Sequence, residues 1–218
     1  RGTPAMLSID SRVQSALESE LQSAMLMTEA RGAAGIILDV ETGEVMALAS
    51  LPMFDPNKIR RDSMKHQNNE VTQSVFELGS TFKPLTIAAA LDAGTVTDLA
   101  VRYNAMEPIK IGGFTIKDDH SQGRYLNVPE TLDHSSNIVT ARIADNLGKE
   151  AMEHMFRRLG FDERPHIELF ERGKPLWPRN WGRVTNMTVA YGHGIAVTPL
   201  HLASAYAALV NGGIWRPA

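Results

Sequence analysis

The sequence predicts a mixed α/β (α+β) domain in which helices are combined with two β-hairpins. Two apolar runs, Gly35–Val40 and Glu44–Ser50, flank a turn that contains Gly43, which is the pattern of a hairpin. A second hairpin is predicted over residues 108–118, around Gly112-Gly113. The chain has 218 residues, 43% of them hydrophobic and 22% charged, so it is long enough to bury a core.

The first element is a predicted helix that Asp10 or Ser11 caps. Its apolar residues recur every four positions and predict one buried stripe: Val13, Leu17, Leu21 and Met25. The first hairpin follows, and Pro52 is expected to end its second strand. Residues 53–74 are polar and irregular, which predicts a long surface loop of the kind often found near a functional site.

The remaining helices are predicted from their start and stop residues. One helix runs from Ser80 to a stop at Gly94, with Pro84 in its first turns, where a missing N–H costs least. Four more are expected, over Val128–His134, Ile138–Leu147, Glu150–Leu159 and from a Thr198 cap to Val210. Residues 161–182 are rich in Pro, Arg and Trp and predict an irregular connection.

Composition excludes several classes of function. The net charge of −3 and the pI of about 6.2 argue against a nucleic-acid partner, which a basic domain would favour. The absence of cysteine excludes disulfides, thiolate metal sites and a cysteine nucleophile. The closest acidic and histidine clusters are Asp118-Asp119-His120 and Asp133-His134, but neither forms a His-x-x-x-His pair, so no metal site is expected.

The motif that most clearly indicates a catalytic site is Glu77-Leu-Gly-Ser-Thr-Phe-Lys83. A serine hydroxyl becomes a nucleophile only when a base takes its proton, and residues three apart on a helix share a face, so Lys83 can reach Ser80. The lysine must be neutral to act as that base, which requires burial or nearby positive charge. The helix start beside Ser80 also offers N–H groups to an oxyanion. Alone, Ser-x-x-Lys is equally compatible with an ordinary helix start.

A second motif, His134-Ser-Ser-Asn137, lies between two predicted helices. A Ser-x-Asn turn can offer the Ser135 hydroxyl for proton relay and the Asn137 amide for a substrate carbonyl. Taken alone, the motif is also explained as a helix cap. Ser-x-x-Lys followed some fifty residues later by Ser-x-Asn is, however, the order found in penicillin-binding proteins and β-lactamases.

Longer segments strengthen this resemblance. Phe76–Pro84 resembles the nucleophile segment of class B penicillin-binding proteins, and Val40–Ser50 with Phe54-Asp-Pro-Asn57 resembles the hairpin and loop before it. Tyr191–Leu200, followed by Asn211-Gly-Gly213, is similar to a segment of the division and elongation transpeptidases. The residues at Val75–Gly79 and Ser121–Arg124 resemble the division-type transpeptidase more than the elongation type. These matches span about residues 8–216.

The resemblance implies a peptidoglycan D,D-transpeptidase with the serine β-lactamase/transpeptidase-like fold, a sheet flanked by helices, without metal or organic cofactor. By position, Ser80 would be the nucleophile and Lys83 the base. Ser135 would pass a proton toward the leaving group, and Asn137 would hold the substrate amide. The implied partners are peptidoglycan stem peptides, β-lactam antibiotics, and membrane-embedded cell-wall synthase and division proteins. The implied location is the periplasmic face of the inner membrane, with an N-terminal anchor outside this chain.

The chain departs from the family in one respect. The family's third motif, Lys-Ser/Thr-Gly, does not occur here. Residues 1–218 are therefore expected to form a partial transpeptidase domain, with the N-terminal hairpin and the helical part but without the C-terminal strands and closing helix. Because the missing motif supplies an oxyanion donor and the carboxylate site, this chain by itself is expected to have little or no activity.

Two other functions remain open from the sequence. A serine β-lactamase or β-lactam sensor domain would share the fold, and a deacylating glutamate would be sought near Glu168 or Glu171. Neither residue stands in a recognisable context, which favours slow deacylation. The other alternative is a non-catalytic scaffold within a cell-wall complex. The presence of Ser80 and Lys83 together with Ser135 and Asn137 argues against it for the parent protein, whereas for residues 1–218 alone the scaffold role stays open.

Overall fold

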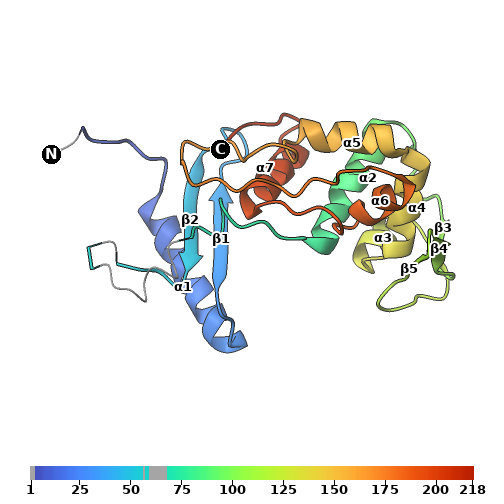
Figure 1. Ribbon diagram of the computed structural model, residues 1–218, viewed down its shortest axis with the longest axis horizontal. Helices are drawn as coiled ribbons and strands as arrows, with labels where there is room; N and C mark the ends of the chain where they lie inside the picture. The colour runs from blue at the N-terminus through green and yellow to red at the C-terminus, as the bar shows by residue number, and fades with distance from the viewer. Residues whose placement is uncertain (1–2, 56, 59–67) are drawn as a thin grey trace. The chain divides into compact units, whose positions relative to one another are not determined.

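The computed structural model describes residues 3–55, 57–58 and 68–218, and within these ranges the protein is a mixture of helices and short antiparallel strands, as the sequence predicts (Figure 1). The chain forms two compact units. The first consists of the described residues of Arg1–Val75, Glu163–Lys174 and Val197–Ala218, and the second of Phe76–Asp162 and Pro175–Ala196.

The first unit is built on the predicted hairpin. Strands β1 (Ala33–Leu38) and β2 (Val45–Leu51) pair antiparallel, and β2 ends directly before Pro52. Helix α1 (Ser11–Thr28) packs against both strands, and Asp10 caps it by accepting hydrogen bonds from two backbone N–H groups. The expectation of a buried stripe on α1 is wrong in degree. Its four residues are only half-buried, because the hairpin covers one side of the helix and leaves the rest exposed.

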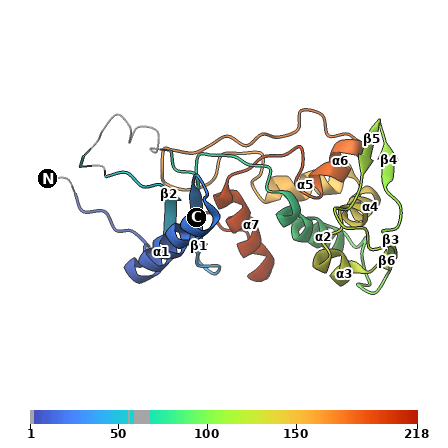
Figure 2. The same ribbon diagram turned by 90° about the horizontal axis from the view of Figure 1, so that it is seen from below.

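Helix α7 (Pro199–Val210) packs against β1, on the side of the hairpin away from α1 in both views (Figures 1 and 2).

The prediction that residues 53–74 form a surface loop is wrong at Val71 and Thr72, because both residues are fully buried. The Thr72 hydroxyl donates a 2.7 Å hydrogen bond to the carbonyl of Glu171, so a distant segment covers this part of the loop. Residues 56 and 59–67 of the prediction lie outside the described residues.

Helix α7 carries a buried histidine whose protonation should control the stability of the first unit. His201 is 4% exposed, and its Nδ1 lies 2.8 Å from the hydroxyl of the capping residue Thr198. Burial lowers the pKa of His201 to about 4, against the raising effect of the Glu163 carbonyl. The native state therefore holds this side chain neutral at a pH where an exposed histidine would take up a proton.

We expect this histidine to destabilise the fold in acid. The unfolded chain binds the proton below about pH 6.5, and the native state binds it only below about pH 4. The free energy of unfolding is therefore unaffected by His201 above pH 6.5 and falls as the pH falls toward 4, by up to roughly 3 kcal/mol. Urea unfolding at pH 7 and pH 4.5 measures the loss. His201→Gln should show a smaller loss, whereas His154→Gln, at an exposed histidine, should match the parent. Equal losses in all three proteins would contradict the prediction.

The second unit is helical around an aromatic core. Helix α2 (Lys83–Asp92) packs against α4 (Asn137–Leu147), and α4 contacts α5 (Lys149–Arg158) and α6 (Arg183–Val189). Four aromatic rings meet between these helices with centroids 5.4–6.2 Å apart: Phe82, Phe156, Phe161 and Trp181. Because Phe82 lies directly before Lys83, this core fixes the start of α2.

The short elements of the second unit complete the fold. Strands β4 (Ile109–Ile111) and β5 (Phe114–Ile116) form the second predicted hairpin, followed by α3 (Val128–Asp133). The sequence does not predict the two-residue strands β3 (Tyr103–Asn104) and β6 (Tyr125–Leu126), nor helix α6. The irregular connection predicted over residues 161–182 is confirmed except for an isolated bridge at Leu176.

Candidate active site

Ser80 lies at a tight turn that runs directly into a helix. The 3-10 helix η2 (Gly79–Phe82) precedes α2 without a break, and Pro84 occupies the first turn of α2. Gly79 has a φ of 57°, in the left-handed region that favours glycine, and this bend leaves the following Ser80 exposed. The positive end of the helix dipole is therefore at the exposed hydroxyl.

Lys83 begins α2 with its side chain directed inward. It is 1% exposed, which is unusual for a lysine. Burial lowers the pKa of Lys83 from 10.5 to about 8, while the carboxylates of Asp118 and Asp119 raise it. About one lysine in ten is then neutral at pH 7, a fraction large enough for a general base.

The predicted Ser-x-Asn motif forms a bend between α3 and α4. Ser135 has a φ of 51°, a left-handed conformation that is rare for a residue with a Cβ atom. Its hydroxyl accepts a 2.8 Å hydrogen bond from Lys83 Nζ and donates a 3.0 Å hydrogen bond to Ser80 Oγ. Lys83 Nζ also donates to the Ser135 carbonyl. The link from Lys83 to Ser80 in this structure therefore passes through Ser135.

The other two residues of the bend are held by the segment that follows β5. Ser136 caps α4 by accepting from Val139 N–H, and its hydroxyl donates a 2.8 Å hydrogen bond to Asp118. The half-buried Asn137 directs its amide to the carbonyl of Lys117, at 3.1 Å. The predicted site residues Ser80, Lys83 and Ser135 are thus joined by hydrogen bonds, and Asn137 lies two residues from them on the same bend.

Two glycines fix the turn that carries Ser80. Gly192, with a φ of 79°, lies so close to Gly79 that a Cβ atom built on it would be 2.2 Å from the Gly79 carbonyl oxygen. Gly194 N–H donates a 2.9 Å hydrogen bond to the carboxylate of Glu77. The segment Gly192–Gly194 therefore packs against the turn that carries Ser80.

Sequence reasoning missed these supporting residues. In the sequence, Asp118 stands out only as part of an acidic and histidine cluster that is not expected to bind metal, whereas its carboxylate binds the start of α4. Glu77 and Gly194 carry no local signal that connects them, since they are more than a hundred residues apart. A cue was available, because Asp118 is an acidic residue at the end of a predicted hairpin and precedes the Ser-x-Asn motif in the chain. No cluster of metal-binding side chains occurs in the part of the chain that the structure describes.

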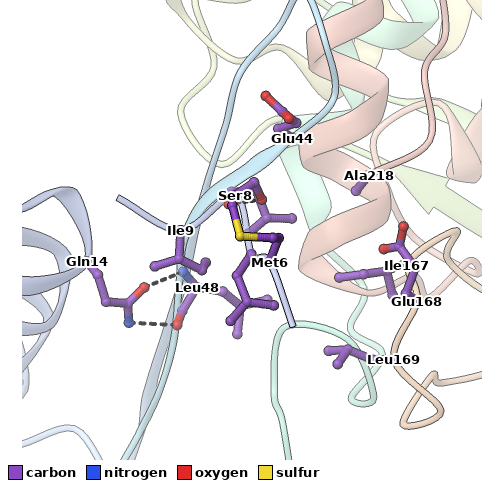
Figure 3. A pocket seen from close by; sticks show the side chains of 12 residues that line it. Met6, Ser8, Ile9, Gln14, Glu44, Leu48, Ile167, Glu168, Leu169 and Ala218 are labelled. Carbon is purple, nitrogen blue, oxygen red and sulfur yellow. Dashed lines mark hydrogen bonds between the residues drawn. The ribbon is translucent and has the colours of Figure 1, made fainter. Parts of the chain in front are cut away.

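A separate hollow lies in the first unit. This pocket has a volume of about 710 Å³ and is lined mainly by apolar side chains from residues 6–9, the hairpin and residues 167–169 (Figure 3). At its edge Gln14 exchanges two hydrogen bonds of 2.9 Å with the backbone of Leu48. None of the four predicted site residues lines the pocket.

Among the described residues, none of the helices is both long and apolar enough to cross a bilayer.

The geometry in the second unit is that of a serine hydroxyl coupled to a buried amine through a second hydroxyl. Such a chain can carry a proton away from Ser80 while Ser80 attacks a carbonyl carbon. The residues that achieve this come from two helix starts, α2 and α4. This arrangement points to the class of proteins that carry the Ser-x-x-Lys and Ser-x-Asn motifs, the penicillin-binding proteins and β-lactamases.

Comparison with known proteins agrees with this class. The chain matches the family described as penicillin binding protein transpeptidase domain over residues 33–218. It is 43% identical to a probable peptidoglycan D,D-transpeptidase FtsI of Caulobacter vibrioides, over 99% of this chain and 36% of that protein. It is 35% identical to a probable peptidoglycan D,D-transpeptidase PenA of Neisseria gonorrhoeae, over 99% of this chain and 37% of the relative.

A solved structure has the same fold. The apo transpeptidase domain of penicillin-binding protein 3 from Burkholderia pseudomallei superposes with a TM-score of 0.85 at 30% identity, covering all of this chain and 61% of that one. The chain belongs to the penicillin-binding protein transpeptidase family, and within it to the class B group of FtsI and PenA. It spans little more than a third of the length of these curated relatives.

Proposed function

We propose that the protein is a peptidoglycan D,D-transpeptidase that works through an acyl-serine intermediate on Ser80 and that β-lactams acylate. The hydrogen-bond chain from Lys83 through Ser135 to Ser80 is the observation that carries this proposal. The lowered pKa of Lys83 supports it, because a neutral amine is needed to accept a proton near pH 7. The names of the FtsI and PenA relatives state the same activity for those proteins.

The reaction follows from these positions. When Lys83 is neutral, the two hydroxyls turn so that Ser80 donates to Ser135 and Ser135 donates to Lys83. Ser80 Oγ then attacks the penultimate D-Ala carbonyl of a stem peptide, and its proton passes through Ser135 to Lys83. The tetrahedral intermediate collapses as the C–N bond breaks, and the proton returns through Ser135 to the departing D-Ala amine. An amine of a neighbouring stem then attacks the ester, which releases Ser80 and forms the cross-link. Asn137 holds the amide of the acyl donor.

A β-lactam follows the first half of this path. Attack by Ser80 opens the lactam ring, and the ring nitrogen takes the proton, but the leaving group stays attached to the acyl-enzyme. The adduct therefore blocks the second amine and is released slowly. By analogy with its relatives, we place the protein in cell division at the periplasmic face of the inner membrane, with cell-wall synthase and division proteins as partners.

Mass spectrometry of the protein, expressed from its complete gene and incubated with benzylpenicillin, tests the proposal. We expect the intact mass to rise by one penicillin per chain and the adduct to map to the peptide that contains Ser80. A synthetic stem peptide ending in D-Ala-D-Ala should release D-Ala. A chain that stays unmodified at saturating penicillin would contradict the proposal and favour a non-catalytic scaffold.

The same experiment distinguishes the β-lactamase alternative. A transpeptidase should keep its adduct for many minutes and consume about one penicillin per chain. Repeated turnover of penicillin with only a transient adduct would show a β-lactamase. We favour the transpeptidase because the chain is similar to FtsI and PenA over almost its whole length.

A further inference from the structure

The segment directly after β5 holds the residues that follow Ser135 in the chain. Asp118 accepts a 2.8 Å hydrogen bond from the Ser136 hydroxyl with one carboxylate oxygen. Its other oxygen accepts a 2.9 Å hydrogen bond from the backbone N–H of Ile138. The Lys117 carbonyl accepts from the amide of Asn137. Two consecutive residues therefore bind the three residues that follow Ser135.

This attachment opposes a local strain. Ser135 has a left-handed φ of 51°, which costs about 1–2 kcal/mol for a residue with a Cβ atom, so the bend persists only if its surroundings hold it. The conformation of Ser135 also directs both its carbonyl and its hydroxyl to Lys83. A bend that relaxed to ordinary backbone angles would move the hydroxyl away from its position between Lys83 and Ser80.

The carboxylate is well suited to this task. It binds at the N-terminus of α4, an eleven-residue helix, where a negative charge is stabilised by the helix dipole. Ser136 is fully buried and Asp118 half-buried, so both hydrogen bonds are partly shielded from water. Asp119, the next residue, is exposed and acts on Lys83 by its charge.

We propose that Asp118 is a positioning residue of this site, because it holds the bend at 135–137 through Ser136 and Ile138 and so keeps Ser135 between Lys83 and Ser80. Asp118 does not touch the substrate in this role and acts only through the bend. The proposal rests on the proposed acyl-serine function. It adds a residue that stands outside the Ser-x-x-Lys and Ser-x-Asn motifs.

The test compares two neighbouring carboxylates. Asp118→Asn and Asp119→Asn each remove one charge that raises the pKa of Lys83, so both should move the pH profile of penicillin acylation to lower pH. Within the described part of the chain, the charges that raise the pKa of Lys83 are those of Asp118 and Asp119. Only Asp118→Asn should also lower the plateau rate at high pH, by about 10- to 100-fold, since it disturbs the bend. Asp119→Asn should keep the plateau rate of the parent.

A second variant tests the path of the effect. Ser136→Ala removes one of the two hydrogen bonds of Asp118, so it should lower the plateau rate as well. Adding Asp118→Asn to Ser136→Ala should lower the rate much less than adding it to the parent, because both changes break the same contact. Fluorescent penicillin and the protein expressed from its complete gene are used throughout, and circular dichroism verifies the fold.

The outcomes separate this proposal from the proposed function. If the parent labels and Asp118→Asn keeps its plateau rate, the positioning role is wrong while the acyl-serine function stands. Strictly multiplicative rate losses for the two variants would also overturn it, because Asp118 would then act by another route. If the parent itself does not label, the acyl-serine function fails and the positioning role fails with it.

Discussion

Replacing Lys83 by arginine should lower the rate of penicillin acylation by about 10²–10⁴-fold. Arginine keeps the positive charge and can still donate hydrogen bonds to Ser135, but it does not lose its proton at any pH a protein tolerates. The proposed function needs a neutral amine that accepts the proton of Ser80 through Ser135. The variant therefore separates a base from a fixed cation. Time courses of fluorescent-penicillin labelling, followed between pH 6 and pH 10, measure the effect.

Lys83→Met supplies the control for folding. Methionine fills a similar volume without a charge. Because the Lys83 side chain is 1% exposed, the substitution removes the free-energy cost of keeping its charge away from water. We expect Lys83→Met to melt at a temperature no lower than that of the parent, although it acylates as poorly as Lys83→Arg. Labelling of Lys83→Arg within ten-fold of the parent rate would contradict the role of Lys83 as a base.

The helices that the sequence predicts well are those whose ends have local chemistry. Gly94 and Gly148 both have positive φ just beyond a helix, and Thr198 caps α7 with its own side chain. Helix α6 and the two-residue strands are missed because seven residues or fewer carry too little periodicity. The burial of Val71 is missed because it depends on the distant segments that cover it.

In the candidate site, too, local relations are predicted from the sequence and contacts between distant segments are not. The sequence brings Ser80 and Lys83 together from their spacing, since both lie at one helix start. It does not show that the link between them passes through Ser135, which is more than fifty residues away. The role of Asp118 is hidden for the same reason, because a carboxylate beside a second carboxylate and a histidine resembles a metal ligand until its actual donors are known.

The contact between Gly192 and Gly79 leads to the second large expected effect. Gly192→Ala would place a Cβ atom 2.2 Å from the carbonyl oxygen and 2.6 Å from the nitrogen of Gly79, so one of the two backbones must move. Gly79 directly precedes Ser80, and a displacement of about 1 Å at a catalytic group can cost about 10²-fold in rate. We therefore expect Gly192→Ala to lose about 10²-fold in penicillin acylation, measured as initial labelling rates.

Gly194→Ala is the matched control, because it isolates the contact from the backbone strain. Gly194 has a φ of 83° against 79° for Gly192, so both variants carry a similar cost of roughly 1–2 kcal/mol for a left-handed alanine. The nearest atom to a Cβ on Gly194 is the Thr188 hydroxyl oxygen at 3.7 Å, an ordinary contact. Both variants should therefore melt earlier than the parent, but only Gly192→Ala should lose acylation strongly. Equal loss in both would mean that general strain, and not the contact with Gly79, controls the position of Ser80.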